Sequence, residues 1–99
     1  MKGKKLDPIH PGEILREEFM APLGLSVHAL AMALRVPATR IGDIARGRRG
    51  ITPDTALRLA RYFNTSPDLW LGLQQEFDLR VARRELASRI EREVEPRSL

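Results

Sequence analysis

Arginine is the residue type in this sequence whose placement points most directly to chemistry. Residues 1–20 carry four basic and four acidic side chains, which cancel, whereas residues 35–61 carry seven arginines and two aspartates. A guanidinium group can donate paired hydrogen bonds to phosphate oxygens or to the edge of a guanine base. The arginine excess therefore favours a polyanionic partner, and a solvated basic face without a partner is the alternative. The seven residues are Arg35, Arg40, Arg46, Arg48, Arg49, Arg58 and Arg61.

The sequence contains no pattern typical of a catalytic, metal or cofactor site. It has no cysteine, and its two histidines, His10 and His28, fall on different predicted elements. It also lacks a phosphate-binding loop, a dinucleotide-binding glycine motif and a Ser/His/Asp pattern. We therefore expect no catalytic residue, no metal and no cofactor. We expect His10 to cap the first helix, His28 to lie on the surface and Trp70 to lie in the core.

The elements that must position the arginines are predicted to be helices. Long alternation of apolar and polar residues, the mark of a strand, is absent, while helix start and stop signals recur. Serine, threonine and proline supply the starts, and glycine supplies two of the stops. The fold class is therefore all-α, with five helices that begin near Pro11, Ser26, Pro37, Thr52 and Ser66. The first helix is expected to end near Met20 and the third at Gly47.

The second and third helices are joined by a very short connection, which is typical of a helix-turn-helix. Ala29 or Ala31 has to be small so that these two helices can cross closely. Larger apolar residues fill the space between the pair and the rest of the domain: Leu30, Leu34, Val36, Ile41 and Ile44. Burial of this side of the third helix leaves the opposite side facing outward, with Ala38, Thr39, Arg40 and Asp43.

Residues 74–95, which follow the start of the fifth predicted helix, contain no glycine and no proline. The helix is therefore expected either to run on or to break once near Asp78. Two pairs, Glu76 with Arg80 and Glu85 with Arg89, have the spacing and order that stabilise a helix. The segment either offers a surface to a partner, folds back on its own core or frays, and its apolar stripe consists of Leu79, Ala82, Leu86, Ile90 and Val94.

The residues around and between these helices carry a more specific pattern. Residues 26–49, SVHALAMALRVPATRIGDIARGRR, resemble the helix-turn-helix of phage repressors (the Cro/CI or XRE type). The flanking segments HPGEILREEF (10–19), PLGLS (22–26), GITPDTALRL (50–59) and SPDLWL (66–71), with Gln74, resemble the HigA (VapI-related) antitoxins. The resemblance covers roughly residues 8–82.

The resemblance implies a fold and a function. The fold would be a compact five-helix, phage-repressor-like domain with a C-terminal helical extension. We expect a flexible N-terminal tail (1–8), a DNA-binding domain (9–77) and the extension (78–99). HigA antitoxins neutralise a HigB toxin, a small RelE-like ribonuclease that cleaves messenger RNA on the ribosome. They also repress their own operon, usually as homodimers on inverted-repeat DNA. The sequence lacks an apolar run of about 20 residues and a secretory signal, so we expect a cytoplasmic bacterial protein that joins the nucleoid when bound to DNA.

The resemblance also assigns candidate roles at the DNA. Ala38, Thr39 and Asp43 would read bases, and Arg40 would reach a guanine or a phosphate. Phosphates would be bound at the start of the second helix and after the third helix, by Ser26, Arg46, Arg48 and Arg49. Arg35 in the turn is a further candidate phosphate ligand on its own chemistry, since its guanidinium can bond phosphate oxygens.

Two positions depart from the family pattern. Position 35, which usually holds glycine because the turn favours a positive φ, is arginine here, so either the turn is strained or its geometry differs. Pro37 stands where a serine or threonine cap is usual, so the third helix would start from the preset φ of proline. Two other readings stay open: a free-standing transcriptional regulator without a toxin partner, and a protein-interaction module that has lost DNA binding.

Overall fold

The computed structural model describes residues 7–98, and all the regular secondary structure in that range is helical. The all-α prediction is thus confirmed. The predicted N-terminal tail falls mostly on residues 1–6, which include Lys2, Lys4 and Lys5 and lie outside the described range. Asp7 is described, and its carboxylate lies 2.9 Å from the guanidinium of Arg84.

The first helical stretch consists of α1 (Pro11–Ile14), a π-helical turn η2 (Leu15–Met20) and α2 (Ala21–Leu23). His10 caps it as predicted, because its Nδ1 accepts a hydrogen bond of 2.8 Å from the Gly12 N–H. The predicted stop near Met20 is wrong, since the helix continues past Pro22 to Gly24, which has φ 64°. Pro22 lies in the first turn of α2, after the π turn, where a proline that has no N–H to donate is tolerated.

The helix-turn-helix consists of α3 (Val27–Leu34) and α4 (Ala38–Ala45). Ser26 caps α3 as predicted, its hydroxyl oxygen accepting from the Ala29 N–H at 3.0 Å. Of the two small residues expected between the helices, Ala31 is buried and Ala29 is exposed. Pro37 is the N-cap residue of α4 and lies outside the helix, with an extended ψ of 143°. The prediction that it opens the helix is therefore off by one residue.

The remaining helices are α5 (Pro53–Phe63) and α6 (Pro67–Glu93), capped by Thr52 and Ser66. Helix α6 is continuous through Asp78, so the break left open by the sequence does not occur. The predicted pair of Glu76 and Arg80 is present at 2.7 Å. Arg89 lies 3.8 Å from Glu93 instead of pairing with the expected Glu85.

The core lies where these helices meet, and most of the predicted interior residues occupy it, while Val36 is only partly buried against it. Trp70 is fully buried, and its indole N–H donates to the Thr65 hydroxyl at 2.9 Å, which satisfies its one polar atom. Phe19 and Phe63 pack against this ring with centroid distances of 4.8 and 6.3 Å. The fully buried apolar side chains include Leu15, Leu30, Ile41, Ile44, Leu59 and Trp70.

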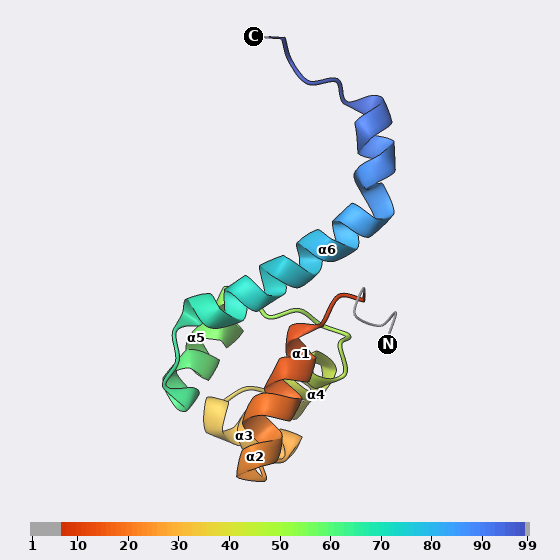
Figure 1. Ribbon diagram of the computed structural model, residues 1–99. Coiled ribbons are helices and arrows are strands. Elements are labelled where there is room, and N and C mark those ends of the chain that lie inside the picture. The colour runs from red at the N-terminus through yellow and green to blue at the C-terminus, as the bar shows by residue number, and fades with distance from the viewer. Residues whose placement is uncertain (1–6, 99) are drawn as a thin grey trace.

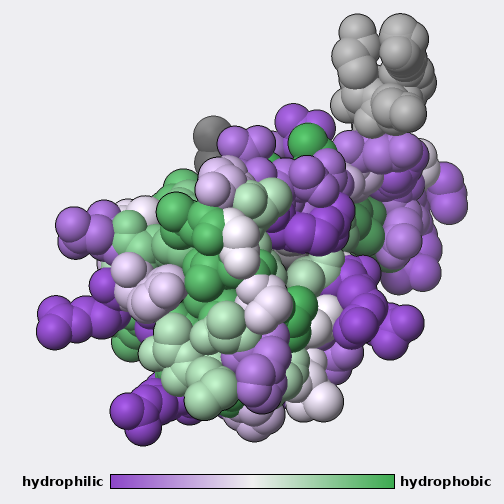
Figure 2. Space-filling model, turned by 90° about the horizontal axis from the view of Figure 1, so that it is seen from below, coloured by the Kyte–Doolittle hydropathy of each residue, from purple (hydrophilic) through white to green (hydrophobic). Residues whose placement is uncertain are grey.

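Helix α6 gives the molecule its elongated outline of 52 × 35 × 22 Å. Figure 1 shows its N-terminal part lying across the other helices, while its C-terminal part bends and projects away from them. From below, Figure 2 shows apolar surface in the middle of the opposite end and hydrophilic side chains projecting at its margin. The exposed hydrophobic residues elsewhere on the globule include Leu23, Met32 and Leu57. None of the helices in the described range is long and apolar enough to span a membrane.

Candidate nucleic-acid interface

The outer side of α4 is built by burial of its inner side. Ile41 and Ile44 are fully buried, so the helical repeat turns Ala38 and Thr39 outward, and both are exposed. Asp43 is half-buried, and its backbone carbonyl accepts from the Arg48 N–H at 2.8 Å. The structure therefore places three of the four proposed base readers on one accessible side of a helix that has no side-chain cap of its own.

The fourth proposed reader, Arg40, is held in an ion-pair network. Its guanidinium lies 2.6 Å from the Asp54 carboxylate, which also accepts from Arg58 at 3.2 Å. Arg58 in turn donates to the Leu34 carbonyl at 2.9 Å, at the end of α3. The hydrogen bonds from Arg40 and then from Arg58 hold the pKa of the Asp54 carboxyl below its usual value. This network connects α4 with α3 and α5.

The turn between α3 and α4 has the left-handed conformation that the family glycine usually provides. Arg35 has φ 61° and ψ 45°, and its N–H and that of Val36 are bonded to carbonyls of the last turn of α3. Its side chain is exposed. Of the two outcomes that the sequence left open, the turn is therefore the strained one, because a side-chain-bearing residue has the left-handed conformation.

The start of α3 lies against the middle of α4. Gly42 is buried, and a Cβ atom added to it would lie 3.7 Å from the Val27 side chain and 3.0 Å from the Arg46 guanidinium. The absence of a side chain at this position therefore brings three features together. These are the capped end of α3 with Ser26, the Arg46 guanidinium and the body of α4. Amide groups at a helix start and a nearby guanidinium both favour an anion.

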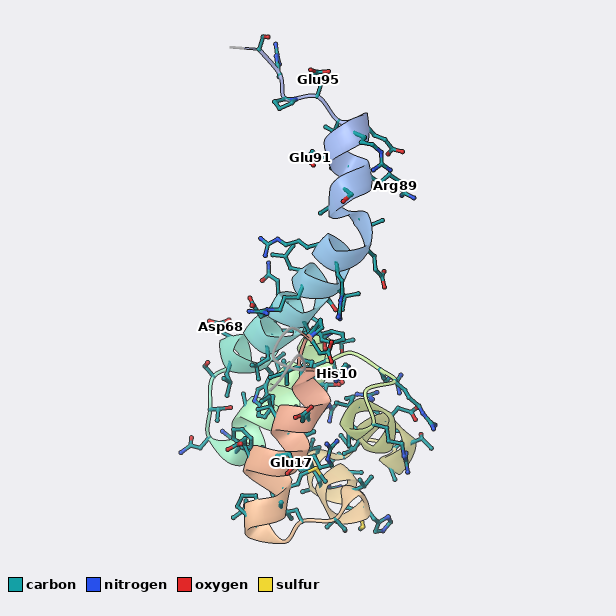
Figure 3. The ribbon with its side chains drawn as sticks, turned by 45° about the vertical axis from the view of Figure 1, so that its right-hand side comes forward. His10, Glu17, Asp68, Arg89, Glu91 and Glu95 are labelled. Carbon is teal, nitrogen blue, oxygen red and sulfur yellow. The ribbon has the colours of Figure 1, made fainter. Side chains whose placement is uncertain are left out.

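The loop between α4 and α5 carries two more of the proposed phosphate ligands, Arg48 and Arg49, and both are exposed. The loop leaves α4 through Gly47 with φ 77°, as expected for a helix end. At its far end the Ile51 N–H donates to the Gln74 side-chain oxygen at 2.7 Å. Figure 3 shows α4 and this loop at the right-hand edge of the globule, with side chains that end in nitrogen projecting outward.

His10 lies where α1, this loop and α6 meet, as Figure 3 shows. Its ring packs edge-on against Phe77 at a centroid distance of 4.8 Å. Burial lowers the pKa of His10, while the Asp78 carboxylate and a hydrogen bond with the Arg49 backbone act in the opposite direction. A neutral ring is required here because Nδ1 accepts the Gly12 hydrogen bond.

Three contacts that support this surface were not predicted from the sequence. Arg16 donates to the Ala45 carbonyl at 2.6 Å and caps the end of α4. A Cβ on Gly12 would overlap the Ile44 carbonyl, so a glycine is required where α1 crosses α4. Gln74 was noted only as part of a family pattern, and its bond to the loop joins residues 23 apart. The i, i+4 spacing of Asp54 and Arg58 was visible in the sequence and could have indicated part of the ion-pair network.

The helix-turn-helix family model HTH_3 matches residues 15–70, which include all of α3, α4 and α5. The chain is also 55% identical over 87 residues to virulence-associated protein I of Dichelobacter nodosus, covering 87% of this chain and 81% of the relative. The chain belongs to the HigA (VapI-related) family of helix-turn-helix proteins. This is a family of DNA-binding antitoxins and not of enzymes.

Solved structures of family members have the same fold. The Pseudomonas aeruginosa antitoxin HigA, solved with the higBA promoter, is 50% identical, with a TM-score of 0.88, and the match covers 90% of this chain and 97% of that one. Antitoxin GraA in complex with its operator is 46% identical, also with a TM-score of 0.88, and the match covers 93% of each chain. The fold and family inferred from the sequence are thus confirmed.

Proposed function

We propose that this chain is an antitoxin that represses its own operon by inserting α4 into the major groove of operator DNA. The observation that carries the proposal is the exposed outer side of α4, which is bordered by the exposed residues Arg46, Arg48 and Arg49. The likeness to antitoxins solved with a promoter and with an operator supports the same reading. The major groove of B-DNA admits an α-helix, and arginine–phosphate contacts on either side fix its register.

The proposed readers and phosphate ligands differ in what they can recognise. The Thr39 hydroxyl can bond several bases and its methyl group can contact thymine, Ala38 offers an apolar contact, and Asp43 can accept from cytosine. Arg40 would contact a guanine or phosphate while it keeps its bond to Asp54. The remaining candidates carry no base information and would bind phosphates: Ser26, Arg35, Arg46, Arg48 and Arg49.

Binding to the DNA upstream of the gene for this chain tests the division between readers and phosphate ligands. Thr39→Ala should relax specificity at one position of the site, while Arg48→Ala should weaken operator and scrambled DNA by similar factors. Fluorescence anisotropy at several salt concentrations should give a log–log slope of about −0.9 per neutralised phosphate, and Arg48→Ala should reduce that slope. Arg97→Ala removes an equal charge beyond α6 and serves as the control. A flat salt response in the wild type, or identical behaviour of the two variants, would contradict the proposal.

The second proposed activity is neutralisation of a HigB-like ribonuclease toxin. Its support is the family likeness, and the candidate contact regions are residues 1–10 and 77–99. We also propose a cytoplasmic bacterial location, where such a toxin and the operator would meet this chain. Co-expression with the adjacent open reading frame should yield a complex whose mass equals the sum of both chains. A chain that binds its operator but never co-purifies with that neighbour would instead be a free-standing regulator.

Homodimerisation would place two copies of α4 on one inverted repeat, with half-sites about one helical turn or ~34 Å apart. Helix α6 supplies the candidate interface because it has two apolar sides. Trp70 faces the core. Leu79 follows it by nine residues, which is two and a half helical turns, and therefore lies on the opposite side of α6. The stripe that begins at Leu79 continues through Leu86 to Ile90, and Leu79 and Ile90 are 43% and 48% exposed. Val94, which was predicted to end the stripe, lies just past the end of α6 with an extended backbone.

A further inference from the structure

The loop between α4 and α5, residues 46–52, has no regular hydrogen-bond ladder that would fix its conformation. Its first half is bonded to α4, because the Gly47 and Arg48 N–H groups donate to the Ile44 and Asp43 carbonyls at 3.0 and 2.8 Å. Its second half is bonded to a different helix, through the 2.7 Å hydrogen bond from the Ile51 N–H to the Gln74 side chain on α6. Arg48 and Arg49 lie between these two anchors.

The side chain of Gln74 is itself fixed on α6. Its amide nitrogen donates to the Asp78 carboxylate at 2.9 Å, one helical turn further along. Because that nitrogen is a donor, the other atom of the amide, the oxygen, faces the loop as the acceptor. The Gln74 amide nitrogen is bonded to Asp78, and the Gln74 oxygen and the Asp78 carboxylate would both repel a phosphate. Gln74 is therefore not proposed as a phosphate ligand itself.

Gly50 shows how closely the loop approaches this amide. A Cβ atom at Gly50 would lie 3.1–3.2 Å from the carbon, nitrogen and oxygen of the Gln74 amide. At the other end of the loop, a Cβ at Gly47 would contact the His10 ring at 3.6 Å, and that ring packs on Phe77 of α6. The loop therefore rests on α6 through Gln74 directly and through His10 indirectly.

We infer that Gln74 is a positioning residue for DNA binding, which holds residues 46–52 in the conformation that presents Arg48 and Arg49 to the phosphate backbone. The inference rests on the proposed function. Without the acceptor at residue 74, the Ile51 N–H would have to find another partner, and the loop would sample conformations in which the arginines point elsewhere. DNA binding would then have to order the loop, and the entropic cost of that ordering would lower the affinity. Helix α6, which carries the proposed dimer surface, is by this bond also a support of the DNA-contacting loop.

The test replaces the acceptor without changing the length of the side chain. Gln74→Met should weaken binding to DNA from upstream of the gene by about tenfold, the effect of losing one charge-assisted contact. It should also reduce the salt dependence of binding. Gln75→Met, the same change at an exposed neighbour, is the matched control and should bind as the wild type does. Circular dichroism at the assay temperature should show the variants to be folded.

Two further variants separate positioning from general stability. In an Arg48→Ala/Arg49→Ala background, Gln74→Met should have no additional effect, because a positioning residue acts only through the groups it positions. The double exchange Gln74→Glu with Asp78→Asn keeps an acceptor for the Ile51 N–H and reverses the donor and acceptor of the side-chain pair. It should restore affinity to within about twofold of the wild type, since the hydrogen bond to the loop is retained.

Each result has a distinct meaning. Wild-type affinity in Gln74→Met, or an equal loss of affinity in the background lacking both arginines, would overturn the positioning role while leaving the proposed function intact. If removal of Arg48 and Arg49 itself left DNA binding unchanged, the proposed phosphate contacts would fail, and the role of Gln74 would fail with them. Weakening by Gln74→Met that is absent in the arginine-free background and reversed by the double exchange would establish the inference.

Discussion

At the scale of single residues, two non-glycine residues within the described range have a positive φ, and both end a helix. Arg35 ends α3 with φ 61°, and Asn64 ends α5 with φ 59°. Asparagine tolerates this conformation better than arginine does, because its short polar side chain can bond locally. The strain at residue 35 is thus retained at the very turn that separates the two helices of the helix-turn-helix.

Arg35→Gly should raise the free energy of unfolding by up to ~1 kcal/mol and weaken DNA binding. The left-handed conformation costs ~1–2 kcal/mol for a side-chain-bearing residue, and the greater freedom of glycine in the unfolded chain offsets part of the gain. The loss of DNA affinity is expected because Arg35 is a proposed phosphate ligand. Denaturant unfolding and anisotropy measure the two effects. Asn64→Gly is the control, with a smaller stability gain and unchanged binding, and a destabilised Arg35→Gly would contradict the strain argument.

His10 should make the stability of the fold depend on pH near neutrality. Burial lowers its pKa in the folded chain, so the unfolded chain takes up the proton first as the pH falls. Stability is therefore fully present above the ordinary histidine pKa of about 6.5 and decreases as the pH falls through the lowered value. Protonation of Nδ1 also removes the acceptor of the Gly12 N–H.

Melting temperatures of the wild type and of His10→Asn, measured between pH 8 and pH 5, test this dependence. Asparagine is a good N-cap residue and does not titrate in this range. The wild type should lose more stability than the variant on acidification. Parallel curves for the two proteins would show that His10 does not titrate differently in the folded and unfolded chains.

At the scale of helices, the position of α4 depends on charges that come from other elements. Asp54 at the start of α5 joins Arg40 of α4 to Arg58, which reaches the end of α3. Arg16 from η2 caps the other end of α4. Helix α4 is thus held by side chains at both ends, in addition to its buried isoleucines.

Asp54→Asn should lower the melting temperature at neutral pH, because the Arg40 guanidinium loses its ion pair with the Asp54 carboxylate. The pKa of Asp54 is held below its usual value by Arg40 and Arg58, so its stabilising effect is present above the ordinary carboxyl pKa. It is lost as the pH falls through the lowered value, and the difference between wild type and variant should shrink in acid. Asp68→Asn removes a first-turn carboxylate at the start of α6 and reports the helix-dipole contribution by itself. Equal effects of the two changes would exclude a contribution from the ion-pair network.

At the scale of the whole molecule, exposed apolar side chains lie both on the projecting part of α6 and on the globule. The first group is the stripe, and the second includes Leu23 and Met32. The stripe residues Leu79 and Ile90 are exposed in the single chain. A second copy with the same stripe can cover it.

Ile90→Glu should convert the proposed dimer to a monomer that keeps the helical content of the wild type. It should also lower affinity for the inverted repeat much more than for a single half-site, because two linked reading helices bind with a high effective concentration. Light scattering after size-exclusion chromatography and anisotropy on both DNAs measure these effects. Met32→Glu places the same charge on the other apolar region and should remain dimeric. If Met32→Glu were monomeric and Ile90→Glu remained dimeric, the dimer interface would lie on the globule and not on α6.

The local sequence determined where the helices of this protein begin and which side of α4 faces outward. The caps Ser26, Thr52 and Ser66 act on an N–H group three residues away, so they depend on neighbours in the sequence alone. The end of the first helix was misjudged because Pro22, which was read as lying beyond the stop, is inside the helical stretch and Gly24 ends it.

Only the tertiary structure decided how the proposed DNA-contacting groups are held. The contacts of Arg40 with Asp54, Gln74 with Ile51 and Arg16 with Ala45 join residues 14, 23 and 29 apart. Hydrophobic periodicity and capping report on a window of a few residues, and they cannot select one partner among many arginines, carboxylates and carbonyls. The packing of the helices makes that selection, because it alone brings groups from distant positions within hydrogen-bond distance.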